Sequence, residues 1–320
     1  MSFKDIKGQD KTVQILKTDL KTSKFCGAYL FIGEEGIGKH LAARNFAKAV
    51  NCLNSKDDAC DNCISCIKIE KQEHPDVHFI GQIDSDAIKI ESIRQLKKDI
   101  GLKPYEAKKK VFIINDAHNL TAEAANALLK VLEEPPRDSI IILITSKPAL
   151  LFKTVVSRCK IIRFYPLKRL QLVEILKKDY SLDDNLAHFL AYFCEGRIGK
   201  AIRLKDTDIF REKNTTINAF LLSRNLNLED ISIQNKDNLL SQLNILSTWF
   251  RDMYLIKIGM PHAQLINLDR KDELLKYMNR YTLFDIDQML KIISDSALYL
   301  EQNVNFKLLI SNLKAELWKG

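Results

Sequence analysis

The sequence predicts an α/β domain built on a parallel sheet and followed by helical domains. Three short apolar runs rich in β-branched residues lie at 28–32, 111–114 and 140–144, and they alternate with segments of helical spacing. Such continuous runs are typical of strands that helices bury on both faces, as in a parallel sheet. After about residue 167 no such run occurs and helical periodicity takes over.

The first predicted strand leads into a glycine-rich loop, because residues 33–40 read GEEGIGKH. This is the spacing of a phosphate-binding loop, G-x-x-x-x-G-K-[ST]. In such a loop backbone N–H groups surround the phosphates, the lysine contacts the β/γ-phosphates and the hydroxyl ligates Mg²⁺. The candidate nucleotide-binding residues are its glycines and its lysine: Gly33, Gly36, Gly38 and Lys39. His40 stands at the hydroxyl position, and a neutral imidazole is a poor ligand for a cation that prefers oxygen.

Four cysteines follow the helix after this loop, in the pattern C-x₇-C-x₂-C-x₂-C: Cys52, Cys60, Cys63 and Cys66. Two consecutive C-x₂-C steps bring thiolates onto a tight turn, where all four can hold one tetrahedral Zn²⁺. Four protein ligands leave no open position, so the predicted zinc is structural. The alternative is a set of free thiols in a polar loop, which would be an oxidation hazard.

The second predicted strand, 111–114, ends at Asn115 and Asp116. In P-loop ATPases an Asp at this place organises the Mg²⁺ ion, and a following Glu commonly activates the attacking water. Asn115 is an uncharged amide, and Asp116 is one methylene shorter than Glu. Together with His40, these residues predict that ATP or ADP binds weakly or not at all and that the chain hydrolyses no ATP.

A helix is predicted between the second and third strands, over 121–132, with Thr121 as N-cap and a proline pair as terminator. After the third strand comes Ser157-Arg158-Cys159. An arginine on the flank of an α/β domain can reach a nucleotide bound by a neighbouring chain, as an arginine finger. The alternative is an ion pair with a carboxylate of the same chain, and the residues alone favour it.

The rest of the chain is predicted to be helical. Three short helices form one unit: 170–180, 185–194 and 199–204. Apolar stripes typical of the core of a helix bundle then lie at 239–256, 283–300 and 306–318. The predicted domains are therefore an α/β domain at 1–167 with a zinc module at about 52–66, a helical lid at 168–206 and an all-helical domain at 207–320.

Net charge and the distribution of basic and apolar residues limit the classes of protein to which the chain can belong. The formal net charge is +8 and the pI about 9.0, which fits a surface that faces nucleic acid, among other basic proteins. The basic residues are scattered, which argues against a stand-alone, zinc-stabilised DNA-binding module. No run of about 18 apolar residues occurs, and the start MSFKDIKGQD has no apolar signal core. We therefore expect a cytoplasmic protein.

Several segments together resemble the delta-prime subunits of the DNA polymerase III clamp loader, within the AAA+ ATPases. They are FKDIKGQ at 3–9, the glycine-rich loop, FAKAVNC at 46–52, the cysteine pattern, HPD at 74–76, IESIR at 90–94, AANALLKVLEEPP at 124–136 and SRC at 157–159. The resemblance covers most of residues 1–204, whereas the last third matches only in its helical character.

This resemblance implies a pentameric ring in which the C-terminal domains pack together as a collar. The chain would sit at one end as an ATP-inert stator, and Arg158 would complete the ATP site of a neighbouring gamma/tau ATPase. The implied partners are the gamma/tau and delta subunits, primer–template DNA and, indirectly, the sliding clamp that the complex loads in replication.

The gamma/tau subunits are close relatives that differ at three places. They carry Lys-Thr in the loop, Asp-Glu after the second strand and a nucleotide-sensing arginine in the lid. This chain has His40, Asn115 and Gly199 at those places. These departures favour the delta-prime type, and an active clamp-loader ATPase of the gamma/tau type is the alternative.

Overall fold

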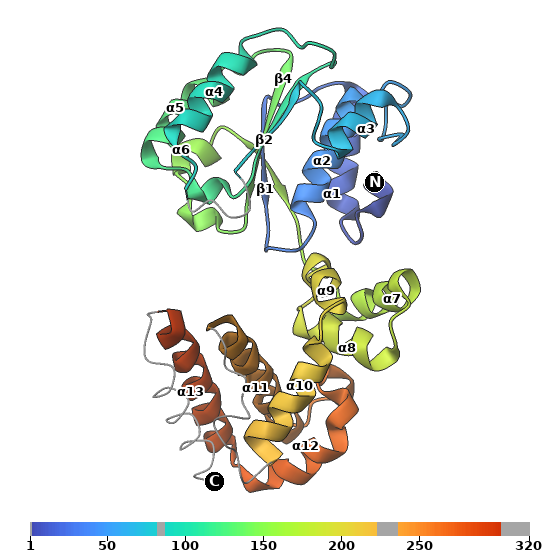
Figure 1. Ribbon diagram of the computed structural model, residues 1–320, viewed down its shortest axis with the longest axis vertical. Helices are drawn as coiled ribbons and strands as arrows, with labels where there is room; N and C mark the ends of the chain where they lie inside the picture. The colour runs from blue at the N-terminus through green and yellow to red at the C-terminus, as the bar shows by residue number, and fades with distance from the viewer. Residues whose placement is uncertain (1, 82–86, 223–235, 302–320) are drawn as a thin grey trace. The chain divides into compact units, whose positions relative to one another are not determined.

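The computed structural model describes residues 2–81, 87–222 and 236–301, and the chain divides into two compact units (Figure 1). Unit 1 comprises Met1–Leu167 with Arg197–Lys200, and unit 2 comprises Lys168–Gly196 with Ala201–Gly320. The further division of 168–320 into a lid and a collar stays a prediction.

Unit 1 is built on one five-stranded parallel sheet with the strand order β2-β3-β4-β1-β5. The strands are β1 (Ala28–Ile32), β2 (Val77–Ile80), β3 (Lys110–Ile114), β4 (Ser139–Thr145) and β5 (Lys160–Arg163). The three central strands and their parallel direction confirm the prediction. The edge strands β2 and β5 are not among the predicted strands, because they are short and only partly buried and so lack a continuous apolar run.

Helices cover both faces of this sheet, as the alternation of strands and helices predicts (Figure 1). On one side lie α1 (Asp10–Thr22), α2 (Lys39–Asn51) and α3 (Ile64–Glu70). On the other side lie α4 (Ile90–Ile100), α5 (Ala122–Glu133) and α6 (Lys153–Val156). Short 3₁₀ helices are η1 (Phe3–Asp5), η2 (Ala117–Asn119) and η3 (Pro148–Leu150).

The two faces of the sheet carry two separate apolar cores. Alternate residues of β1 enter different cores: Tyr29 and Phe31 join one with Phe46 of α2, whereas Leu30 joins the other with Leu128 of α5. This alternation follows from the two-residue period of a strand.

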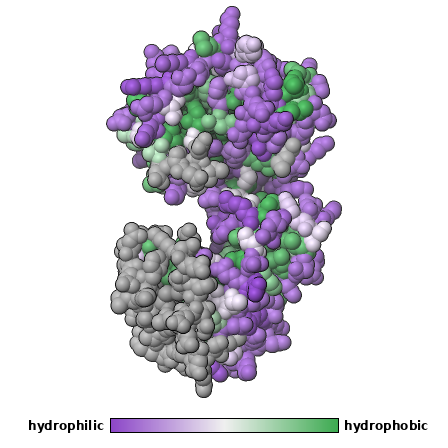
Figure 2. All heavy atoms as spheres, viewed as in Figure 1, coloured by the Kyte–Doolittle hydropathy of each residue, from purple (hydrophilic) through white to green (hydrophobic). Residues whose placement is uncertain are grey.

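The outer face visible in Figure 2 is mainly hydrophilic on unit 1, with hydrophobic residues gathered in smaller areas.

Helix α5 begins where the sequence predicts and ends one residue after the predicted Leu132. The Thr121 hydroxyl accepts a hydrogen bond from the backbone N–H of Ala124 at 3.2 Å, which satisfies one of the free donors of the first turn. Glu133 is the last helical residue, two positions before Pro135, whose ring cannot continue a helix.

In unit 2 the described residues form no strand. Its helices are α7 (Arg169–Tyr180), α8 (Asp184–Phe193), α9 (Ile198–Lys205, which starts in unit 1), α10 (Ile209–Ile217), α11 (Lys236–Lys257), α12 (Lys271–Tyr277) and α13 (Leu283–Glu301). Shorter turns are η4 (Asn218–Leu222), η5 (His262–Gln264), η6 (Leu268–Arg270) and η7 (Met278–Arg280).

The apolar stripe of α11 is buried as predicted, with Trp249, Phe250 and Met253 in the core, and α11 packs against α13. The predicted stripe at 306–318 lies outside the described residues. Among the helices that the structure describes, none is both long and apolar enough to cross a membrane.

Candidate functional site

The glycine-rich loop connects β1 to α2, where a phosphate-binding loop belongs. Gly36 and Gly38 have φ angles of 76° and 95°, in the left-handed region that favours glycine. Lys39 is only 7% exposed, and its ammonium donates hydrogen bonds to the carbonyl oxygens of Gly33 at 2.6 Å and Glu34 at 2.5 Å. Burial lowers the pKa of Lys39 to about 8. The lysine therefore binds its own loop in this structure.

A second segment of unit 1, Arg197–Lys200, lies directly against the loop. The backbone N–H of Gly199 donates to the carbonyl oxygen of Gly36 at 2.6 Å. A Cβ atom on Gly199 would stand 2.9 Å from that oxygen, so a side chain there would push the two segments apart. The Arg197 guanidinium lies 3.7 Å from the Glu34 carboxylate. Glycine at position 199 therefore has a packing reason of its own.

The residues at the expected Mg²⁺ position make internal contacts as well. The His40 ring packs on Phe79 with centroids 5.9 Å apart, and burial lowers the pKa of His40, which keeps the imidazole neutral. The Asn115 amide donates to the carbonyl oxygen of Gly81 at 3.3 Å. Asp116 has a left-handed backbone with φ 43° and is the N-cap residue of η2.

The structure brings the four predicted zinc ligands together. One sulfur atom from each residue lies within 4.8 Å of the others, in the set Cys52, Cys60, Cys63 and Cys66. A tetrahedral zinc with Zn–S bonds of about 2.3 Å requires sulfurs about 3.8 Å apart, so this set fits one ion. Thiolate sulfur as the sole donor favours zinc over Mg²⁺ or Ca²⁺.

Helix ends position these sulfurs. Cys52 is the C-cap of α2 and Cys63 is the N-cap of α3, so both helices point at the cluster. Backbone N–H groups donate to two of the sulfurs at 3.3 Å, from Ser55 to Cys52 and from Cys63 to Cys60. Burial raises the pKa of the Cys63 thiol, but hydrogen bonds from the backbone N–H of Leu53 and from Cys66 outweigh it and bring that pKa to about 6. Such bonds favour the thiolate at Cys63, whereas burial and the hydrogen bond with Cys63 raise the pKa of the Cys66 thiol.

Arg158 lies in the turn after α6, with its side chain 32% exposed. Its Nε donates to Glu133 Oε1 at 2.8 Å, and Nη2 donates to the same oxygen. Its Nη1 donates to the carbonyl oxygen of Thr154 at 2.9 Å and to the Ser157 hydroxyl at 3.4 Å. This is the ion pair within the chain that the residues alone favour, and the finger role stays a prediction.

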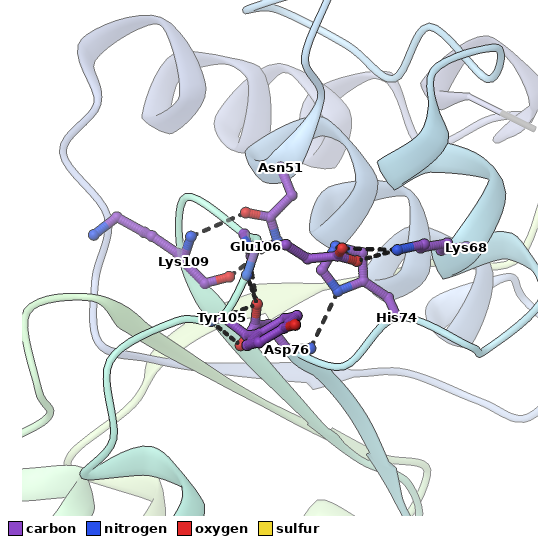
Figure 3. A network of polar contacts seen from close by, with 8 residues as sticks. Asn51, Lys68, His74, Asp76, Tyr105, Glu106 and Lys109 are labelled. Atoms are coloured by element: carbon purple, nitrogen blue, oxygen red, sulfur yellow. Dashed lines mark hydrogen bonds and ion pairs between the residues drawn. The ribbon is translucent and has the colours of Figure 1, made fainter.

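A buried carboxylate that the sequence analysis did not identify organises the loop before β3 (Figure 3). Asp76, only 1% exposed, accepts hydrogen bonds from the backbone N–H groups of Tyr105 at 2.9 Å, Glu106 at 2.8 Å and Ala107 at 2.9 Å. Burial raises the pKa of Asp76, but these donors outweigh it and hold the pKa below its usual value. The only signal in the sequence was the HPD segment at 74–76, which no periodicity explains.

The same network ties this loop to the cysteine module. Both Glu106 carboxylate oxygens accept hydrogen bonds from Lys68 of α3 at 2.7 Å. The Asn51 side chain, at the end of α2, bonds the backbone of Lys109 in both directions at 3.0 Å. His74 Nδ1 accepts from the backbone N–H of Asp76 at 3.1 Å (Figure 3). The cysteine module is therefore held against the sheet by polar contacts besides its own sulfurs.

Replacing Asp76 by Asn should lower the free energy of unfolding by about 2–3 kcal/mol at pH 7, because one acceptor oxygen becomes an NH₂ facing buried N–H donors. Since the folded pKa is lowered, this contribution exists above the unfolded value of about 3.9 and is lost as pH falls through the folded pKa. Urea unfolding between pH 7 and pH 2 measures both effects. The control is Asp138→Asn, at a carboxylate 66% exposed. Equal stability of the two variants at pH 7 would contradict the role of Asp76.

Known protein families match both the N-terminal and the C-terminal part of the chain. The family model described as DNA polymerase III, delta subunit, matches residues 8–168, and the model of that subunit's C-terminal part matches residues 210–316. The DNA polymerase III subunit delta' of Bacillus subtilis is 29% identical over 98% of this chain and 97% of its own length. The subunit tau of B. subtilis is 33% identical over 65% of this chain and 38% of its own length. The tau/gamma subunit of Haemophilus influenzae is 33% identical over 65% of this chain and 31% of its own length. The chain thus spans about a third of these tau and gamma relatives but almost all of the delta' relative.

Proposed function

This chain belongs to the DNA polymerase III delta-subunit family, and on that basis we propose that it serves in a clamp loader as a subunit of the delta-prime type. The similarity to the delta' protein of B. subtilis extends over 97% of that protein's own length, whereas the similarity to the tau and tau/gamma proteins above covers only 38% and 31% of theirs. In this role the chain assembles with gamma/tau and delta subunits, and the complex loads a sliding clamp on primer–template DNA.

The chain itself turns over no ATP in this proposal. The observation that carries this part is the self-bonded glycine-rich loop. A phosphate entering the loop would have to displace Lys39 from the carbonyls of Gly33 and Glu34. A Mg²⁺ ion that accompanies the nucleotide would then meet His40 and Asn115, whereas it prefers charged oxygen ligands such as carboxylates. ATP or ADP therefore binds weakly or not at all.

In this proposal the chain contributes to catalysis through Arg158, which acts on a nucleotide bound by a neighbouring chain. Phosphoryl transfer places negative charge on the transferred group, and an arginine supplied from an adjacent chain stabilises it. A guanidinium suits this task because it is always charged and presents N–H donors in a fork that matches phosphate oxygens. The partial exposure of Arg158 supports this role, since a finger must be reachable from outside its own domain.

The remaining parts of the chain serve assembly. The four cysteines hold a structural zinc that fixes the module between α2 and α3, and the helices of 207–320 form the collar through which the subunits associate. Residues 168–206 form the lid domain, which lies between the α/β domain and the collar along the chain.

The gamma/tau-type alternative rests on the retained lysine and glycine spacing of the loop and on the similarity to tau.

One experiment separates these alternatives. Co-expressed with the gamma/tau and delta chains of its organism, this chain should co-purify with them in one complex, whereas the isolated chain should show no turnover of Mg-ATP. Turnover by the isolated chain that Lys39→Ala abolishes would instead establish the gamma/tau-type ATPase. Salt-sensitive binding of primer–template DNA by the isolated chain, without association with the other subunits, would favour a separate DNA-binding module.

A further inference from the structure

The Arg158 guanidinium is held by its own chain at all three nitrogens. Nε and Nη2 both donate to one carboxylate oxygen of Glu133, and Nη1 donates to the Thr154 carbonyl and the Ser157 hydroxyl. Of the five N–H donors of a guanidinium, four therefore have acceptors within the chain. An arginine in this state offers little to a phosphate.

The carboxylate is placed by two elements that pack on each other. Glu133 is the last residue of α5, and Arg158 follows α6, which lies against α5. The two side chains meet at the surface, where Glu133 is 49% exposed and Arg158 is 32% exposed. The next residue, Glu134, is also exposed and is the C-cap of the helix.

The ion pair between Arg158 and Glu133 neutralises the positive charge on which an arginine finger depends. A finger acts through uncompensated positive charge, and a carboxylate at hydrogen-bond distance cancels most of it at the neighbour's nucleotide. An exposed ion pair is weak, so a multiply charged phosphate group can displace the carboxylate from Arg158. The pair therefore suits a latch that is closed in the separate subunit and opens when a nucleotide of the neighbour comes within reach.

We propose that Glu133 is a positioning residue that holds Arg158 away from the neighbour's ATP until the phosphate group displaces the carboxylate. This inference rests on the proposed finger role of Arg158. It predicts that Glu133 suppresses ATP turnover at the neighbour's site, because the carboxylate competes with the phosphate group for the Arg158 guanidinium.

The test is Glu133→Gln in the complex reconstituted with the gamma/tau and delta chains. This substitution keeps the shape of the side chain but removes its charge. We expect the single-turnover rate of hydrolysis at the adjacent gamma/tau site, measured without DNA, to rise about two- to five-fold, the range that an exposed ion pair allows. The matched control is Glu134→Gln, which should leave this rate at the wild-type value. A turnover without DNA that is unchanged or lowered by Glu133→Gln overturns the proposal.

A double variant shows whether the effect passes through the arginine. Combined with Arg158→Ala, the Glu133→Gln substitution should change nothing further, since the group it releases is gone. A rise that persists in the Arg158→Ala background overturns the latch. If Arg158→Ala alone leaves turnover unchanged, the finger role itself fails and this inference falls with it. If Arg158→Ala lowers turnover but Glu133→Gln does nothing, only the latch fails.

Discussion

Replacing Arg158 by Ala should leave the clamp-loader complex assembled but lower ATP hydrolysis at the adjacent gamma/tau site by about 10³-fold or more. The physical reason is that the transferred phosphoryl group carries charge that the neighbour's own residues do not fully balance. The other ATP sites keep turning over, so the DNA-stimulated rate of the whole complex should fall by the share of one site. Single-turnover hydrolysis in the reconstituted complex resolves that share.

Two controls define the role of Arg158. Arg158→Lys keeps a positive charge but loses the planar fork, and it should give an intermediate rate. Arg137→Ala removes an exposed arginine from the loop between α5 and β4 and should leave hydrolysis unchanged. Unchanged single-turnover kinetics in Arg158→Ala would rule out the finger, and the pair with Glu133 would then be only a surface ion pair.

Loss of the metal should produce the largest effect on stability. In peptides that fold around it, structural zinc contributes about 10–16 kcal/mol, and here it is expected to hold the chain between α2 and α3. Cys66→Ser removes a buried ligand, so the variant should purify without zinc and unfold at a markedly lower temperature. A wild-type sample should contain about one zinc per chain, measured by a chromophoric chelator after denaturation. Acid should release the metal, because protonation competes for the thiolates.

The control for this substitution is Cys159→Ser, which changes a cysteine outside the cluster. Burial raises the pKa of the Cys159 thiol to about 12, so it remains a thiol, and its sulfur donates to the carbonyl oxygen of Val155 at 3.3 Å. This variant should retain its zinc. Wild-type protein that carries no metal, and whose unfolding temperature a chelator leaves unchanged, would contradict the zinc site.

Features that depend on neighbouring residues were predictable from the sequence. The central strands β1, β3 and β4 are buried on both faces, so their apolar runs mark them directly. The glycine-rich loop and the cysteine cluster are defined by short fixed spacings, and the structure brings each set together. The edge strands β2 and β5 escaped prediction because a partly exposed strand carries a mixed pattern of residues.

Features that join distant segments could not be predicted in the same way. The buried Asp76 meets a loop about thirty residues further along the chain, and no pattern of residues pairs the two segments. Gly199 reaches Gly36 across most of the length of unit 1. The sequence predicted the absence of a sensor arginine at that place, but not that the glycine packs on the loop.

By itself, the sequence determined the central strands, the composition of the cysteine cluster and the substitutions in the phosphate-binding loop, because each is written in residues close together along the chain. The tertiary structure alone decided which groups those residues meet: Lys39 binds its own loop, Gly199 covers Gly36, and Arg158 pairs with Glu133. Such pairings depend on how the helices and strands pack. A guanidinium can donate hydrogen bonds to any carboxylate within reach, and the packing of α5 against α6 brings Glu133 to Arg158.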